Sequence, residues 1–250
     1  MGHKYPLGLP TTIKWKKLVE ELIHFSDEED SKEIAKQITD NVASRFNAIA
    51  RDKGILAITE FFTELAKSFD QKNPIGYLGS KGIEVKGDIT PISVALSLKK
   101  WISDNQESKE YSAIGREAAT KAILKWFKNK ETGQQEIFET TFDQYEKWRP
   151  LSTGSGFCEL TTLYYGFFTD KYLKYFLDRE ATKRIPNITA RNRLDNEISK
   201  HSQEVAKVTQ SFAAGWFNKI IDKEIGKKEI KGYVKHSFEK LREALKQEVQ

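Results

Sequence analysis

The chain has 250 residues, of which 38% are hydrophobic and 12% aromatic, and its formal net charge at pH 7 is +5. This apolar content is enough for the core of one large or two small domains, which excludes a disordered chain. The single cysteine, Cys158, excludes an internal disulfide framework, and the first ten residues lack the basic-then-apolar run of a signal peptide, so we expect a cytoplasmic protein.

Apolar residues recur at helical spacing along most of the first half of the chain. The pattern predicts helices over residues 11–25, 30–49, 55–69, 90–101, 109–129 and 135–148. Between residues 70 and 89 it is interrupted by four glycines and Pro74. This interruption predicts one long loop or a small hairpin.

The segment RPLSTGSG at 149–156 breaks the helical pattern. It is the predicted boundary between an N-terminal half, 1–148, and a C-terminal half, 157–250, which form either two units or one continuous domain. Beyond it, the spacing predicts helices over 157–182, 194–221 and 229–247. The longest apolar stretch, 157–169, is too short for a membrane span and contains Glu159, so we expect no transmembrane segment.

Taken together, these segments predict an all-α protein. No repeat with a period of about 20 to 50 residues is present, which argues against a solenoid. We therefore expect a compact multi-helix bundle of about eight to nine helices.

Basic residues are concentrated in the last third of the chain, where residues 171–250 hold 18 Lys and Arg against 11 Asp and Glu. Five cations surround the RIPN break at 184–187, and Tyr172 and Tyr175 precede it on an aromatic helix stripe; the cations are Arg179, Lys183, Arg184, Arg191 and Arg193. Cations and stacked aromatic rings together are typical of single-stranded nucleic-acid binding. The alternative is a solvated helix face with the aromatic stripe in the core.

His201 occupies a position on an apolar stripe, with Glu197 one turn before it and Glu204 nearly one turn after it. A buried histidine between two carboxylates suits a metal ligand or a proton carrier. Di-metal sites in helical bundles, however, use Glu-x-x-His motifs, and this chain has only the reversed order. A core histidine is therefore the alternative, and we predict neither a metal nor another cofactor.

Three further features have both a functional and a structural interpretation. The glycine-rich pieces at 76–82 and 152–156 resemble phosphate-binding loops in composition but lack the GK[ST] ending, so connecting loops are the alternative. Cys158 lies in the first turn of a predicted helix, where the helix dipole lowers a thiol pKa, although burial would make the thiol inert. Gly215, inside a predicted helix, indicates a close approach of two helices.

Four phrases of the sequence resemble those of an uncharacterised family of bacterial helical proteins: PLGLPTTIKWKK at 6–17, FTDKYLKYFLDRE at 168–180, AAGWFNK at 213–219 and HSFEKLREAL at 236–245. The resemblance covers both ends of the chain and not residues 70–148. It implies a helical bacterial protein encoded among phage-defence genes, with no catalytic residue to carry over. It draws attention to Asp178, Arg179 and Glu180, and to the GWF turn at 215–217.

These observations lead to three functional hypotheses. The first is a non-enzymatic interaction protein that binds another protein, as a component of a bacterial anti-phage defence system. The second is nucleic-acid binding through the basic C-terminal third. The third is a helical metal-dependent enzyme around His201.

Overall fold

The structure, a computed structural model, describes residues 16, 17, 20, 28–105, 110–130, 141–185 and 187–247. For 28–32, 42–44, 105, 110, 141–143, 178–184 and 247 it describes the backbone alone. The described residues form α-helices and short 3-10 turns and contain no strand. The predicted all-α class is therefore confirmed.

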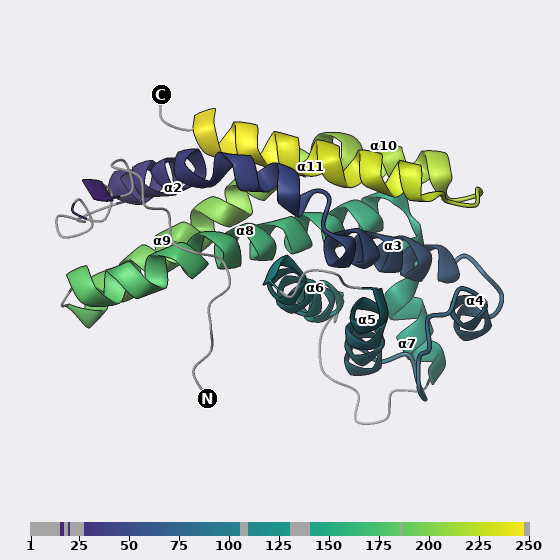
Figure 1. Ribbon diagram of the computed structural model, residues 1–250. Helices are drawn as coiled ribbons and strands as arrows, with labels where there is room; N and C mark the ends of the chain where they lie inside the picture. The colour runs from purple at the N-terminus through teal and green to yellow at the C-terminus, as the bar shows by residue number, and fades with distance from the viewer. Residues whose placement is uncertain are drawn as a thin grey trace.

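The helices follow one another in the order α2 (Glu28–Ile49), α3 (Lys53–Ser68), α4 (Pro74–Ser80), α5 (Pro91–Asn105), α6 (Glu110–Lys128), α7 (Thr141–Trp148), α8 (Gly154–Arg184), α9 (Ile188–Ala206), α10 (Gln210–Ile220) and α11 (Lys227–Gln247). Helix α8 lies in the middle of the molecule (Figure 1). Helices α2, α10 and α11 lie above it in that view, and α5, α6 and α7 below it.

The sequence of α8 explains its central position. Its buried side chains include Phe157, Leu160, Tyr164, Tyr165 and Phe168, and each of them is at most 1% exposed. These residues lie on several sides of the helix, and α8 packs against α6, α9 and α10. A helix that is apolar on most sides is stable only when neighbours cover those sides, so α8 organises the core.

The turn between α2 and α3 is fixed by Asp52. Its carboxylate caps α3 by accepting a hydrogen bond from the backbone N–H of Ile55 at 3.1 Å. Ser112 of α6 donates to the same carboxylate oxygen at 3.2 Å. A Cβ on Gly54 would lie 2.0 Å from the Ser112 Oγ, so this turn and α6 are in close contact. Arg51 and Lys53, on either side of Asp52, are thereby held at the start of α3.

The segment 70–89 contains the short helix α4, followed by a loop, and no hairpin. Asn73 caps α4 by accepting from the Gly76 N–H at 3.0 Å, and Pro74 occupies the first helical position. The glycines at 76 and 79 are therefore helical rather than part of a loop. Positive φ angles occur in the described residues only at Gly82 and Gly87, which form the loop that follows.

The helix predicted over 194–221 is divided by a 3-10 turn at Lys207–Thr209. The buried Thr209 hydroxyl donates to the Ala206 carbonyl at 2.8 Å and lies 3.2 Å from the Thr162 hydroxyl of α8. A threonine hydroxyl that bonds a local carbonyl competes with the helical pattern, which explains the turn. The helix predicted over 11–25 lies outside the described residues, apart from 16, 17 and 20.

One connected core joins all of these elements, because helices α2 to α11 each contribute a buried apolar side chain to the same cluster. This cluster includes residues on both sides of 149–156. The division into halves 1–148 and 157–250 stays a prediction. Among the described helices, none combines the length and apolar character that a bilayer span requires.

Candidate functional site

The structure places two of the five cations of the basic segment. Arg191 is half-buried and Arg193 is exposed, both on α9. The side chains of Arg179, Lys183 and Arg184 lie outside the described residues. Arg193 borders a shallow groove along α9, which it shares with Glu197 and Lys200. Glu197 and Lys200 form an ion pair at 2.6 Å. The groove therefore carries both positive and negative side chains and is not purely basic.

Tyr172 belongs to the core. Its side chain is 1% exposed, and its ring contacts Phe46, Phe168 and Phe176 at centroid distances of 5.6, 6.0 and 5.2 Å. Burial raises the pKa of the Tyr172 phenol above its ordinary value. Tyr175 is half-buried, with its ring 5.3 Å from that of Phe176. A nucleic-acid base could reach Tyr172 only if the core opened, so the core interpretation of the aromatic stripe is the one that fits this fold.

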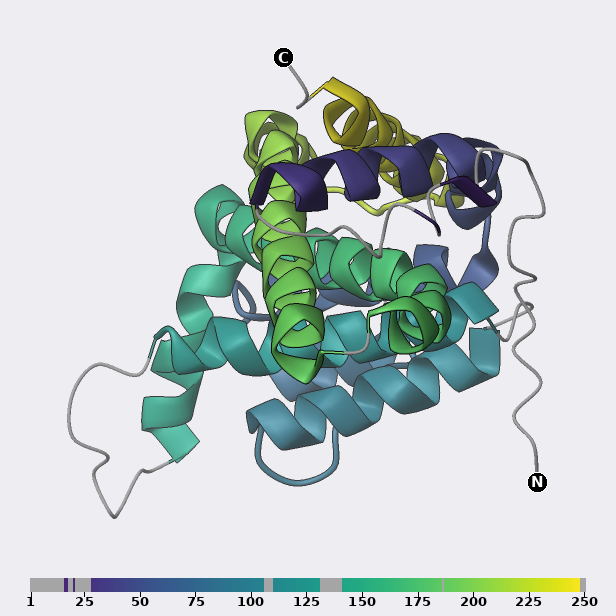
Figure 2. The same ribbon diagram turned by 90° about the vertical axis from the view of Figure 1, so that its left-hand side faces the viewer.

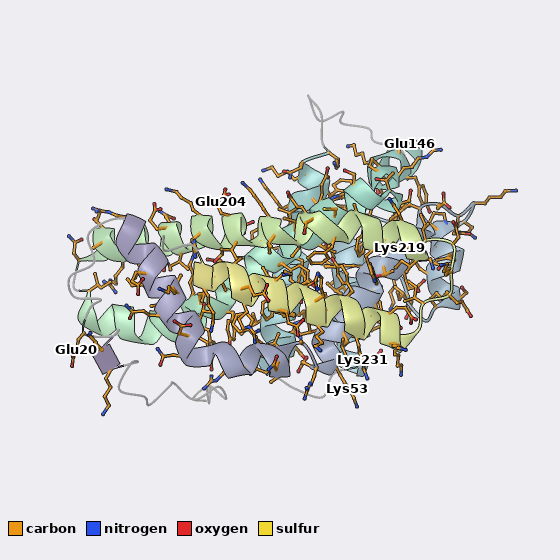
Figure 3. The ribbon with its side chains drawn as sticks, turned by 90° about the horizontal axis from the view of Figure 1, so that it is seen from above. Glu20, Lys53, Glu146, Glu204, Lys219 and Lys231 are labelled. Atoms are coloured by element: carbon orange, nitrogen blue, oxygen red, sulfur yellow. The ribbon has the colours of Figure 1, made fainter. Side chains whose placement is uncertain are left out.

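His201 is buried at 5% exposure, on the face of α9 that packs into the core. Its two neighbouring carboxylates pair with lysines of their own helix or turn, Glu197 with Lys200 and Glu204 with Lys207 at 2.7 Å. Figure 3 shows Glu204 at the outer edge of the molecule. In the part of the chain that the structure describes, no three His, Cys, Asp or Glu side chains come together as a metal site.

A polar network that the sequence analysis missed joins α8 to α9. Asp170, which is 8% exposed, pairs with Lys174 at 2.9 Å and accepts a hydrogen bond from the Ser199 hydroxyl at 2.9 Å. The Lys174 ammonium also donates to Ser199 at 2.7 Å. Every charged group in this triad has a partner, so the network fixes the register of α8 against α9.

Cys158 is half-buried, and burial is the main reason why the pKa of its thiol is raised, in spite of its place in the first turns of α8. The glycine-rich segment before it connects the 3-10 turn at Arg149–Ser152 to α8. Thr153 caps α8 by accepting from the Gly156 N–H at 3.0 Å, and a Cβ on Gly156 would lie 2.0 Å from the Pro150 carbonyl oxygen. Gly156 is therefore required by a close backbone approach.

The interpretation of Gly215 as a point of close helix approach is wrong. A Cβ built on this residue would meet no atom within 4 Å, and Gly215 is exposed. The packing of α10 instead depends on its neighbours, since Phe217 lies against Phe157 with centroids 4.6 Å apart. A glycine inside an amphipathic pattern does not reveal on its own which side of the helix it occupies.

Among the described residues, the neighbouring helices α5 and α6 carry three of the exposed large apolar side chains. Ile92 and Leu96 of α5 are 67% and 62% exposed, and Leu124 of α6 is 42% exposed. Exposed lysines accompany them on the same two helices: Lys99, Lys121, Lys125 and Lys128. These seven residues are called the α5–α6 surface below. Helix α5 lies near the lower edge of the molecule, and α6 lies beside it (Figure 2).

The sequence contained a signal for this surface. At 100° per residue, Ile92 and Leu96 lie about 40° apart on α5, as do Val94 and Leu98. The second pair is fully buried, and the first points to the opposite side of the helix. Helix α5 therefore has apolar residues on two opposite sides, and its core-facing side covers only one of these groups. Apolar residues on the other side of a surface helix indicate contact with a further partner.

No family model, curated protein or solved structure matches this chain.

Proposed function

We propose that the protein is a non-enzymatic binding protein that engages another protein through the α5–α6 surface. The observation that carries this proposal is the exposure of Ile92 and Leu96, two large apolar side chains one helical turn apart. Single apolar residues on a surface are ordinary, whereas two large, exposed apolar side chains that are neighbours on one helix, as Ile92 and Leu96 are, favour a contact with a partner.

The charges on this surface favour one kind of partner. Lys121, Lys125 and Lys128 follow the exposed stripe of α6 around Leu124. An acidic, amphipathic surface, such as a helix with apolar anchors and flanking carboxylates, would cover the apolar residues and pair with these lysines. The bacterial source, the phage-defence context and the cytoplasmic location stay predictions.

The test compares the α5–α6 surface with a matched exposed residue elsewhere. Ile188, 65% exposed at the start of α9, lies outside this surface and provides the control. The unmodified protein, the double variant Ile92→Glu with Leu96→Glu, and Ile188→Glu are each used to recover partners from the native host, and binding is then measured with the purified partner. We expect the double variant to weaken binding at least about tenfold, which corresponds to about 1.4 kcal/mol, and Ile188→Glu to leave it unchanged.

Two results would contradict the proposal. The first is a partner that binds the double variant as tightly as the unmodified protein. The second is equal weakening by the double variant and by Ile188→Glu, which would reflect added charge rather than a lost contact. Light scattering on the purified protein identifies a third outcome, a dimer that the double variant abolishes, in which case the surface binds a second copy of this chain.

A further inference from the structure

A cavity of about 280 Å³ lies between the first half of α3 and the first turns of α11. Leu56 and Ala57 of α3 and Ile230 of α11 provide its apolar wall. The backbone carbonyl of Ala57 accepts a hydrogen bond from the indole of Trp101 at 2.9 Å, which holds this part of α3 against α5. The volume is just below the roughly 300 Å³ at which the usual range of ligand pockets begins, and the apolar wall suits a flat ring.

Four cations and one carboxylate complete the lining of this cavity. Arg51 comes from the turn before α3, Lys53 from the first residue of α3, Lys227 and Lys231 from one face of α11, and Glu60 from the middle of α3. Figure 3 shows Lys53 and Lys231 on the same edge of the molecule. Positive charge therefore exceeds negative charge around the cavity.

All four cations are exposed, and an anion bound among them would reduce the repulsion between their like charges. An arginine beside several lysines is the arrangement that recognises phosphate, since the guanidinium can bind two oxygens at once. The cations come from two separate elements and surround one cavity. This geometry fits one phosphate group better than the extended backbone of a nucleic acid.

Glu60 adds a hydrogen-bond-accepting carboxyl group to the otherwise cationic lining of the cavity. It is half-buried, and its pKa is raised, first by burial and then by the neighbouring Glu64, while Lys227 opposes the shift. A carboxylate inside a cationic cavity repels phosphate but accepts hydrogen bonds from N–H and O–H groups. A ligand that satisfies both features has an anionic end and a hydrogen-bond donor.

We infer that this cavity binds a small organic phosphate of nucleotide size. The phosphate lies among Arg51, Lys53, Lys227 and Lys231, an apolar ring rests on the wall formed by Leu56, Ala57 and Ile230, and a hydroxyl or amino group donates to Glu60. The site is separate from the α5–α6 surface, so the inference stands or fails independently of the proposed function.

Calorimetric titration with adenosine 5′-monophosphate, inorganic phosphate and adenosine tests this assignment. We expect the nucleotide to bind at least about tenfold more tightly than either fragment, because only the nucleotide uses both the cations and the wall. Arg51→Ala and Lys231→Ala should each weaken nucleotide binding at least about fivefold. Lys228→Ala is the matched control: Lys228 is exposed beside Lys227 and does not line the cavity, and its loss should change affinity less than about twofold.

A fourth variant, Glu60→Gln, tests the proposed hydrogen bond from the ligand to Glu60. Removal of the carboxylate charge should strengthen inorganic phosphate binding and so narrow the preference for the nucleotide. The inference is overturned if no probe binds, if Lys228→Ala weakens binding as much as Lys231→Ala, or if inorganic phosphate binds as tightly as the nucleotide. It is also overturned if a single-stranded oligonucleotide binds in a Lys231-dependent way while the mononucleotide does not. Circular dichroism of each variant confirms that it is folded.

Discussion

The indole of Trp148 lies parallel to the ring of Phe69, with the centroids 5.6 Å apart and 4° between the ring planes. Trp126 stacks on the same indole at 5.5 Å, and the Trp148 N–H donates to the Ile89 carbonyl at 2.7 Å. These contacts join the ends of α3, α6 and α7 to the loop before α5. They make Trp148 the point at which four segments of the chain meet.

Replacement of Trp148 by alanine should lower the free energy of unfolding by about 3–5 kcal/mol, because a fully buried indole is removed from a packed core. Trp148→Phe keeps an aromatic ring and loses the hydrogen bond to Ile89, so its effect should be smaller. Urea unfolding followed by circular dichroism measures both. Leu124→Ala, at a 42% exposed position, is the control and should cost less than about 1 kcal/mol. Equal effects of Trp148→Ala and Leu124→Ala would refute this account of the packing.

Gly215→Ala should stabilise the protein by about 0.5–1 kcal/mol. The residue lies inside α10, a new Cβ would meet nothing within 4 Å, and alanine favours the helix over glycine by this amount. Gly156→Ala is the contrasting variant and should destabilise, because its Cβ would collide with the Pro150 carbonyl. Thermal unfolding of the two proteins should therefore shift in opposite directions. A fall in stability for Gly215→Ala would mean that α10 is packed more closely than described.

Alkaline pH should unfold the protein cooperatively. Burial raises the pKa of the phenols of Tyr164, Tyr165, Tyr172 and Tyr233 above the ordinary 10.0. A raised pKa in the folded state means that the folded protein holds these protons more tightly, so stability is complete below pH 10 and falls as the pH rises above it. Each phenol contributes a slope of about 1.4 kcal/mol per pH unit.

Tyrosinate absorbance and circular dichroism, recorded together during an alkaline titration, measure this effect. Ionisation of the buried phenols should coincide with the loss of helix. The pKa of the Tyr77 phenol is also raised, by burial and by its hydrogen bond to Glu64, so five phenols contribute to the slope. Tyr172→Phe removes one of them and should reduce the slope of stability against pH by about one fifth, after correction for its own effect on stability. Ionisation of all tyrosines near pH 10 in a protein that keeps its helices would contradict the burial of these rings.

Cys158 should react slowly with thiol reagents in the native protein. Burial raises the pKa of its thiol, and its Sγ lies 4.0 Å from the Gln210 carbonyl, so the reactive thiolate is scarce at neutral pH and is partly covered. We expect native alkylation to be at least about tenfold slower than in urea, where the thiol regains its ordinary pKa. Reaction at the same rate in both conditions would indicate an activated thiol, as the helix dipole alone predicts.

The sequence by itself determined the helical class and most helix positions, because helix formation is governed by local spacing and capping. The apolar repeat located α3, α5, α6, α8 and α11 to within a few residues of their observed bounds. The predicted start of α5 at residue 90 agrees with a local cap, because the Thr90 hydroxyl accepts a hydrogen bond from the Ser93 N–H at 3.1 Å and Pro91 occupies the first helical position.

Tertiary structure alone decided which side of each helix has a neighbour. The periodicity of α5 does not distinguish Val94 from Leu96, yet one is buried and the other exposed, because only Val94 faces the core. The cavity between α3 and α11 likewise collects Arg51 and Lys231, which are 180 positions apart, so no local pattern could connect them. Local chemistry fixes where a helix forms, whereas burial depends on packing between segments that are distant along the chain.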